Sequence, residues 1–298
     1  MADIRALRGR IKSVGNIQKI TRAMEMVATT KLRRFQDRLL GFRPYADAMV
    51  GMTRRLLGSM GDDASPGTLP LLAARPEGGR TAVVVVTSDR GLCGAYNTNV
   101  LAKAESVLDA AGDDPLLWVF GEKGYRYFLR RKREIHRSFL DSPLEKMAYG
   151  EAAQAARDLT AQFLEGGVDR VQVVSSRFVS MAKFVPEMNE WLPLQVETLA
   201  AAGEGEEEEK LGGDMILEPD APTLFEALLP RVLEVRFWNL LQEGLTSEYA
   251  SRRMSMKNAT EAAEEMGGEL RRIYNRARQE AITGELMDIV GGSEALRT

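Results

Sequence analysis

Ser88–Asn97, with the sequence SDRGLCGAYN, comes closest in residue type and spacing to a catalytic or phosphate-binding loop. It follows an apolar, β-branched run and precedes a helical pattern, and Gly91 and Gly94 could let the backbone approach a phosphate group. The two established phosphate-binding glycine patterns, G-x-G-x-x-G and G-x-x-x-x-G-K-[ST], are both absent. We therefore interpret the segment as a structural or docking loop. The alternative is a stand-alone α/β enzyme that acts on phosphate esters.

Cys93 and His136 are the single cysteine and the single histidine of the chain. One cysteine excludes an internal disulfide, and the two residues together are too few for a Cys/His zinc site. His136 lies in the basic run RRKREIHR, which is an unfavourable setting for the base of a nucleophilic triad. The sequence thus predicts no catalytic residue, no metal site and no cofactor.

The segment Tyr125–Arg137 mixes aromatic and basic residues, which could bind single-stranded nucleic acid by stacking and charge. An exposed helix face followed by an edge strand is the preferred interpretation. A second group of charged residues could serve as paired carboxylates in acid–base chemistry, but on a coiled coil such residues usually form solvated flanks: Glu261, Glu264, Glu265, Glu269 and Glu280.

Charge is distributed unevenly along the 298 residues, whose net charge is −3. Residues 1–43 contain 11 basic and 3 acidic residues, a net charge of +8, whereas Gly203–Lys210 reads GEGEEEEK. A basic segment usually has an acidic partner, so residues 1–43 predict an interaction surface. We expect the acidic tract at 204–209 to be a surface loop.

No apolar run approaches the roughly 20 residues that a membrane-spanning helix needs, and the first residues lack the apolar core of a secretion signal. Any membrane contact is expected to be made through other proteins.

The N-terminal residues carry a heptad pattern that predicts one helix of a coiled coil. The apolar stripe that such a helix turns toward its partner helix is called the seam below. Its first run is Ile4, Leu7, Ile11 and Val14, and its second run is Ile17, Ile20, Met24 and Val27. The join between the runs slips by three residues, which predicts a local change of supercoil. Pro44 is expected to kink the helix.

The C-terminal residues carry a longer seam with the same spacing, and no proline occurs from Arg231 onward. Such a pattern, sustained over more than four heptads, indicates a second long helix. Gly267–Gly268 is its expected weak point. The predicted seam residues are Leu245, Tyr249, Arg252, Met256, Ala259, Ala263, Met266, Leu270, Ile273 and Ala277.

The middle of the chain alternates short β-branched runs with helical patterns, which is typical of a largely parallel α/β domain. The expected strands are 81–89, 115–121, 170–179 and, less clearly marked, 191–199, and the expected helices are 97–112 and 150–167. The predicted fold class is a long antiparallel coiled coil of N- and C-terminal helices with an inserted Rossmann-like α/β domain. The predicted domains are an N-terminal helix at 1–60, a linker at 61–79, the α/β domain at 80–200, an acidic loop and foot segment at 201–221, and a C-terminal helix at 222–292.

Three long segments resemble, in order, the signatures of the gamma subunit of F-type ATP synthase. They are IRALRGRIKSVGNIQKITRAMEMVATTKLRR at the start, VVTSDRGLCGAYNTN at Val85–Asn99, and the segment Glu248–Gly292. The resemblance implies a non-catalytic rotor shaft that couples ion-driven rotation to ATP synthesis on other subunits. It implies as partners a hexamer of alpha and beta subunits, the epsilon subunit and the ring of c subunits.

The resemblance also implies contact residues. Met24, Lys31, Arg33, Arg34, Arg253, Arg278, Gln279 and Thr283 match positions that face a beta subunit. Three further residues match positions in an apolar sleeve of the hexamer: Leu286, Ile289 and Val290. Glu218 matches a position at the foot, the end of the shaft that lies near the c ring.

One departure from the family concerns redox control. Chloroplast relatives carry an inserted cysteine pair that acts as a redox switch, and a chain with Cys93 alone lacks this switch. No transit peptide precedes the first signature, so we expect a bacterial protein, peripheral on the cytoplasmic face of the inner membrane. A coiled-coil nucleic-acid-binding adaptor remains the alternative from another functional class.

Overall fold

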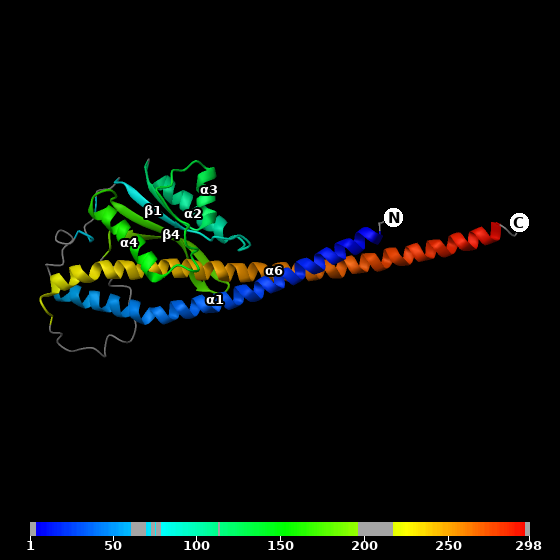
Figure 1. Ribbon diagram of the computed structural model, residues 1–298, viewed down its shortest axis with the longest axis horizontal. Coiled ribbons are helices and arrows are strands. Elements are labelled where there is room, and N and C mark those ends of the chain that lie inside the picture. The colour runs from blue at the N-terminus through cyan, green and yellow to red at the C-terminus, as the bar shows by residue number, and fades with distance from the viewer. Residues whose placement is uncertain are drawn as a thin grey trace. The chain divides into compact units, whose positions relative to one another are not determined.

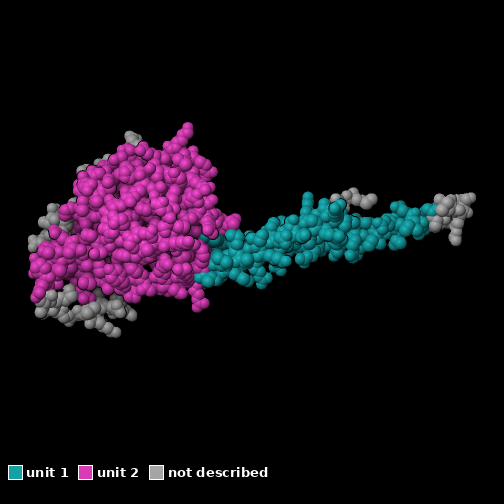
Figure 2. Space-filling view, viewed as in Figure 1, with its two compact units in different colours: residues 1–30, 252–298 teal, residues 31–251 magenta. Residues whose placement is uncertain are grey.

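The computed structural model describes residues 4–60, 70–72, 75, 79–112, 114–195 and 217–295, without the side chains of residues 291 and 293–295. The chain divides into two compact units, coloured in Figure 2. Unit 1 consists of residues 1–30 and 252–298, and unit 2 consists of residues 31–251. The predicted linker at 61–79 and the acidic tract at 204–209 lie largely or wholly outside the described residues.

The described elements confirm the predicted fold class, because two long terminal helices enclose an α/β region in the chain (Figure 1). In chain order they are α1 (Ile4–Met60), β1 (Thr81–Val86), α2 (Tyr96–Ala110), β2 (Leu116–Phe120), α3 (Glu122–Arg130), β3 (Arg137–Phe139), α4 (Tyr149–Leu164), β4 (Arg170–Ser180), β5 (Lys183–Leu192) and α6 (Ala221–Ala295).

The sheet of unit 2 has the strand order β3-β2-β1-β4-β5. All neighbours are parallel except β4 and β5, which form an antiparallel hairpin. The prediction of a fourth strand at 191–199 was wrong in position, because β5 ends at Leu192. β5 contains Pro186 and mixes polar with apolar residues, which hid it from a search for apolar runs.

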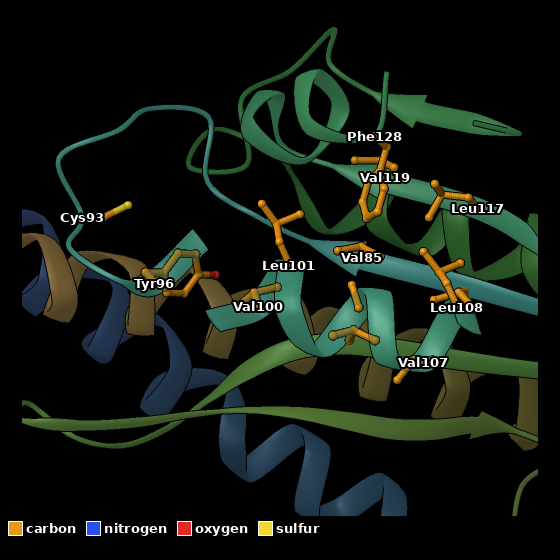
Figure 3. Close-up of a cluster of buried hydrophobic side chains, with 13 residues drawn as sticks. Val85, Cys93, Tyr96, Val100, Leu101, Val107, Leu108, Leu117, Val119 and Phe128 are labelled. Atoms are coloured by element: carbon orange, nitrogen blue, oxygen red, sulfur yellow. The ribbon is translucent and has the colours of Figure 1, made fainter. Parts of the chain in front are cut away.

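Both faces of the central strands are covered, since every residue of β1 is buried. On one face, Val83 and Val85 of β1 pack with Val100 and Leu108 of α2 and with Phe128 of α3 (Figure 3). On the other face, Phe237 of α6 contacts Phe120 of β2 and Trp191 of β5, with ring centroids 5.7 and 5.6 Å apart. The C-terminal helix therefore forms part of the domain core.

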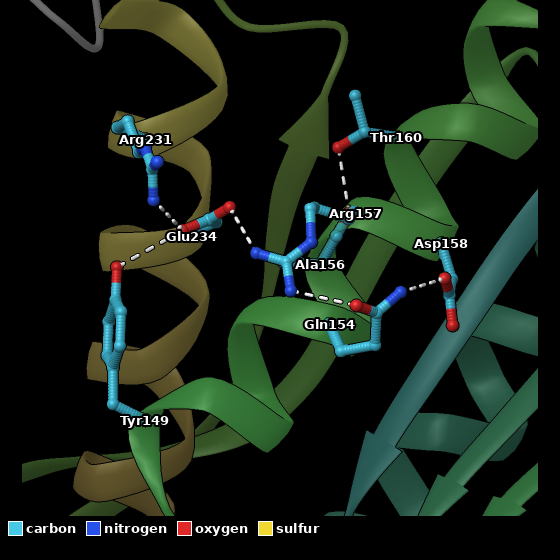
Figure 4. A network of polar contacts seen from close by, with 8 residues as sticks. All are labelled: Tyr149, Gln154, Ala156, Arg157, Asp158, Thr160, Arg231 and Glu234. Atoms are coloured by element: carbon cyan, nitrogen blue, oxygen red, sulfur yellow. Dashed lines mark hydrogen bonds and ion pairs between the residues drawn. The ribbon is translucent and has the colours of Figure 1, made fainter.

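A buried carboxylate joins α4 to α6 within unit 2 (Figure 4). The Glu234 side chain is 4% exposed and lies 2.8 Å from Nη1 of Arg157 and 3.5 Å from Nη1 of Arg231. The Tyr149 hydroxyl donates to the same carboxylate at 3.4 Å. Burial and the charge of Glu234 raise the pKa of Tyr149 to about 12, so this hydroxyl remains a donor at neutral pH.

In unit 1, residues 4–30 of α1 pair with α6 in antiparallel orientation. Arg8 donates to the Tyr274 hydroxyl at 2.9 Å, and Thr260 donates to the Thr21 hydroxyl at 2.8 Å. Partners advance along α1 as they recede along α6, as an antiparallel pair requires.

The predicted slip in the α1 seam was wrong. The buried and half-buried positions continue at regular heptad spacing through Val14, Gln18, Thr21 and Ala28. Ile17, Ile20 and Val27 are each more than half exposed. A polar residue can lie in the seam here because the Thr21 hydroxyl accepts a hydrogen bond from Thr260. With Thr21 facing α6, the neighbouring Ile17 and Ile20 face outward.

A similar correction applies to α6. Met266 and Ile273, predicted seam residues, are 54% and 44% exposed, while Gly267 is buried and Tyr274 is half-buried. An added Cβ at Gly267 would lie 3.8 Å from Val14, which places this glycine against α1. The helix runs without interruption through Gly267–Gly268, and α1 likewise runs through Pro44.

Glu234→Gln is expected to lower the free energy of unfolding by about 1–3 kcal/mol, because hydrogen bonds to a charged group contribute roughly that much. Urea unfolding followed by circular dichroism measures the change. Glu226→Gln, at an exposed position of the same helix, is the matched control and should change stability by less than about 0.5 kcal/mol. Equal effects of the two variants would contradict the role given to Glu234.

Gly267→Ala is expected to raise the free energy of unfolding by roughly 0.5–1 kcal/mol, because alanine favours a helix and its methyl group makes an ordinary contact with Val14. Gly267→Leu should destabilise the pair of helices, because the larger side chain must enter the seam. Thermal unfolding measures both changes. Gly268→Leu, where no atom lies within 4 Å of an added Cβ, is the control. If the two leucine variants melt alike, the seam assignment is wrong.

Candidate functional site

The loop Ser88–Asn97 is held by its own hydrogen bonds. The Ser88 amide donates to Oδ1 of Asn97 at 3.1 Å, and Nδ2 of Asn97 donates to Oγ of Ser88 at 2.7 Å. Ser251 of α6 donates to the Cys93 carbonyl at 2.6 Å. These hydrogen bonds engage the Ser88 amide, the Asn97 side chain and the Cys93 carbonyl within the domain, and the geometry fits a structural or docking loop.

Asp89 anchors the same loop to its surroundings, a role that the sequence analysis missed. Its carboxylate accepts backbone N–H groups of Leu144 at 3.0 Å and of Glu122 at 3.3 Å. Burial raises the pKa of Asp89, and these two hydrogen bonds act in the opposite direction. No spacing rule pointed to Asp89, because its partners lie far away in the chain.

The basic run Tyr125–Arg137 covers most of α3, the connection after it and the first residue of β3, and several of its arginines are paired locally. Arg133 lies 3.0 Å from Glu105 and 2.6 Å from Asp109, both on α2. Arg126 pairs with Glu122 one turn away on α3. These acids compete with nucleic acid for the same guanidinium groups, so the run is a poor candidate for a nucleic-acid interface.

Lys31, predicted to face a beta subunit, takes part in an ion pair within unit 2. Its ammonium lies 2.6 Å from Oε2 of Glu145 and 3.3 Å from the Tyr249 hydroxyl, and Tyr249 also bonds to Glu145. Burial alone would raise the pKa of Glu145, but hydrogen bonds from Lys31 and Tyr249 outweigh it and lower that pKa. Lys31 therefore joins α1 to the segment before α4.

The other predicted contact residues of the two long helices lie mainly at the surface. Arg33 and Arg34 are exposed, while Met24 and Arg253 are half-buried. Arg278, Gln279 and Thr283 are exposed on α6. The predicted foot residue Glu218 is also exposed and precedes α6.

Exposed apolar side chains mark both helices of unit 1. Leu286, Ile289 and Val290 of α6 are each more than half exposed. The sequence analysis missed a corresponding set on α1, since it assigned Ile17, Ile20 and Val27 to the internal seam. Apolar groups gathered at a surface usually mark a protein interface, so these faces are candidate binding surfaces. The signal was present in the heptad pattern, but the pattern alone does not say which of two adjacent stripes faces the partner helix.

Among the described residues, no group of three or more histidine, cysteine, aspartate or glutamate side chains could hold a metal ion. The described helices include none with the length and apolar character that crossing a membrane requires.

Comparison with known proteins identifies the family. The family model described as ATP synthase matches residues 3–296. The ATP synthase gamma chain of Saccharopolyspora erythraea is 41% identical over 317 aligned positions, covering 99% of this chain and 98% of its relative. That of Mycobacterium tuberculosis is 40% identical with the same coverage.

The chain belongs to the ATP synthase gamma chain family. Among solved structures, this chain matches a chain of the Euglena gracilis mitochondrial ATP synthase with a TM-score of 0.65. That structure is described as OSCP/F1/c-ring in rotational state 3. The two are 21% identical, and the match covers 98% of this chain and 94% of that one. A chain of the Tetrahymena thermophila mitochondrial ATP synthase, described as central stalk/c-ring, matches with a TM-score of 0.57 and 24% identity, covering 80% of this chain and 99% of that one.

Lys31→Met is expected to lower the free energy of unfolding at pH 7 by about 1 kcal/mol, because Glu145 loses a partly exposed charged partner. The pKa of Glu145 is lowered in the folded chain, so its stabilisation is complete above the ordinary value of 4.5 and is lost as pH falls through the folded pKa. The difference from the unmodified chain should therefore shrink below about pH 4.5.

Urea unfolding at neutral and acidic pH tests this expectation. Arg33→Met, two residues away at an exposed position, is the matched control and should have little effect at either pH. A loss for Lys31→Met that stays constant with pH would show that Glu145 is not the partner.

Proposed function

We propose that this chain is the central rotor shaft of an F-type ATP synthase, coupling ion-driven rotation of a membrane ring to ATP synthesis. Full-length similarity to gamma chains is the observation that carries the proposal, since it spans 99% of this chain and 98% of its relatives. The outward-facing apolar residues of unit 1 support it, because a shaft inside a ring of subunits must present its surface to them.

The proposed partners are a hexamer of alpha and beta subunits, the epsilon subunit and the c ring. The chain itself carries out no chemistry in this proposal. It acts by presenting different faces to the catalytic subunits as it turns, since only differential contacts shift a site between conformations. The proposed location is peripheral, on the cytoplasmic face of a bacterial inner membrane, in line with the bacterial sources of its relatives.

For the beta-subunit contact we propose Met24, Arg33, Arg34 and Arg253 together with a cluster on α6. That cluster is Arg278, Gln279 and Thr283. Lys31 is expected to contribute mainly through its ion pair with Glu145, because its ammonium already has two partners. Surface ion pairs contribute little each, roughly 0–1 kcal/mol, which suits contacts that must break as the shaft turns.

The proposed apolar contact with the hexamer sleeve involves Leu286, Ile289 and Val290, each more than half exposed. The proposed foot contact with the c ring involves Glu218. The alternative of a nucleic-acid-binding adaptor has no support from the relatives, and local ion pairs occupy much of the basic run.

Native mass spectrometry of a complex purified through a tag on this chain tests the proposal. One copy held with three alpha and three beta subunits is the expected result for a shaft in a threefold ring. A free monomer, or a complex with nucleic acid, would contradict the proposal.

The double variant Gln279→Ala with Thr283→Ala is expected to reduce ATP synthesis by the assembled complex about tenfold, because two contacts worth roughly 0.5–1.5 kcal/mol each would be lost. Glu285→Ala, exposed on the same helix, should leave synthesis unchanged. Normal synthesis by the double variant would refute the assignment of these two residues to the catalytic contact.

A further inference from the structure

Residues 144–149, called the strap here, lead into α4 and contact both long helices within unit 2. Leu144 and Met147 are buried. The Leu144 amide also donates to the Asp89 carboxylate of the loop before α2 at 3.0 Å. These contacts fix the strap to the α/β region, which runs from β1 to β5.

Glu145 of the strap joins the two long helices at one level. Its carboxylate lies 2.6 Å from the Lys31 ammonium of α1 and accepts a hydrogen bond from the Tyr249 hydroxyl of α6. Lys31 also donates to that hydroxyl at 3.3 Å, so the three side chains contact one another. The strap, α1 and α6 thus contribute one residue each to a polar contact.

Tyr149 of the strap repeats this arrangement with aromatic rings. Its ring centroid lies 5.8 Å from that of Phe42 on α1 and 5.9 Å from that of Trp238 on α6, and the latter two are 6.5 Å apart. Aromatic pairs at such distances stabilise their arrangement beyond the area they bury. The Tyr149 hydroxyl also donates to the buried Glu234 of α6 (Figure 4). This second contact again takes one residue from each of the three elements.

The two contacts have the same spacing on both helices. Lys31 and Phe42 are 11 residues apart on α1, and Trp238 and Tyr249 are 11 residues apart on α6. Eleven residues make about three helical turns and a rise of about 16 Å, so each helix presents both of its residues on one face. The strap therefore holds the antiparallel pair at two separate levels.

The contact at Glu145 lies at the limit of unit 2, which comprises residues 31–251. Lys31 is the first residue of this unit, and Tyr249 is two residues from its last. Both long helices continue through these limits without interruption. A twist carried along α1 and α6 into unit 2 consequently reaches the strap at this contact before it reaches the aromatic one.

The α/β region also holds α6 directly. Ser251 donates to the Cys93 carbonyl at 2.6 Å. The Tyr96 hydroxyl donates to the Gly244 carbonyl at 3.0 Å. Parts of a chain that pack against each other usually move relative to one another unless the interface prevents it, and a body held by one helix could swing about that helix. Attachment to α1 at two levels restricts this swing, because the region is then fixed to both members of the pair.

We propose that the strap is the torque-coupling element of this chain, which makes the α/β region and the two long helices turn as one body. Glu145 and Tyr149 are its positioning residues. The proposal rests on the proposed rotor function, since it assigns to particular residues the transfer of rotation within the shaft.

The first experiment measures the isolated full chain with nitroxide labels at Ala48→Cys on α1 and Glu134→Cys before β3. Both positions are exposed, whereas the native Cys93 is 2% exposed and should react poorly. Pulsed electron paramagnetic resonance gives the distribution of distances between the labels. A narrow distribution is expected, and Glu145→Ala should broaden it by adding a second population. A distribution that stays equally narrow in Glu145→Ala would overturn the proposal.

Glu187→Ala is the matched control for this measurement. Glu187 pairs with Arg177 inside the β4–β5 hairpin, and the side chains of Glu145 and Glu187 are 26% and 27% exposed. The control should leave the distribution unchanged, and a broadening equal to that of Glu145→Ala would overturn the proposal.

A charge exchange completes the test. Glu145→Lys alone should broaden the distribution, because two like charges then face each other. Lys31→Glu together with Glu145→Lys restores opposite charges and should return the distribution to its original width. Failure of the exchange to narrow it would show that the ion pair does not hold the strap.

The second experiment measures torque coupling in the assembled ATP synthase, held by its hexamer, with a bead at either Ala48→Cys or Glu134→Cys. In Glu145→Ala the variance of the bead angle between steps should rise about two- to fivefold at Glu134→Cys, because a partly exposed ion pair shifts an equilibrium by up to about that factor. The variance at Ala48→Cys should stay the same. Equal variance at the two positions in this variant would overturn the proposal.

The two experiments separate the strap from the rotor function. A bead that turns at neither position contradicts the rotor proposal, and the torque-coupling role falls with it. The label distances need no partner chain, so they decide independently whether the strap holds the α/β region to α1.

Discussion

The antiparallel seam of unit 1 is the constraint on which the surface of this protein depends. A helix can turn only a narrow stripe toward its partner, and hydrogen-bonded polar residues occupy part of that stripe here. Thr21 meets Thr260, and Gly267 lies against Val14, so the seam closes without the largest apolar side chains nearby. Ile17, Ile20 and Val27 consequently face outward. Apolar surface of this kind is costly for an isolated chain, and it is explained when other subunits cover it.

Unit 2 is held by a different kind of interaction. Its sheet is covered on both faces by apolar side chains, while single buried or half-buried carboxylates connect the helices around it. Glu234 joins α4 to α6, and Glu145 connects Lys31 of α1 with Tyr249 of α6. These charges are paired, so they fix the arrangement of the elements at little net cost.

The sequence predicted the long helices and the parallel strands, because heptad spacing and β-branched runs are local signals. It misplaced β5, since an edge strand with a proline and mixed polarity has no such signal. It also assigned Ile17 and Ile20 to the seam, because two adjacent apolar stripes look alike until the partner helix is known. The ion pair of Lys31 with Glu145 joins residues 114 positions apart, and no local pattern reveals such a pairing. Contact residues such as Gln279 and Thr283 followed from family resemblance and stay predictions.

Rotation of this chain within an assembled ATP synthase is the central claim, and single-molecule observation tests it most directly. A bead can be attached at Glu134→Cys, an exposed position before β3, because the native Cys93 is 2% exposed and should react poorly. The account predicts that ATP drives the bead in one direction, with three equal steps in each turn, as a threefold ring of catalytic subunits requires. A complex that hydrolyses ATP at its normal rate while the bead stays still would contradict the account.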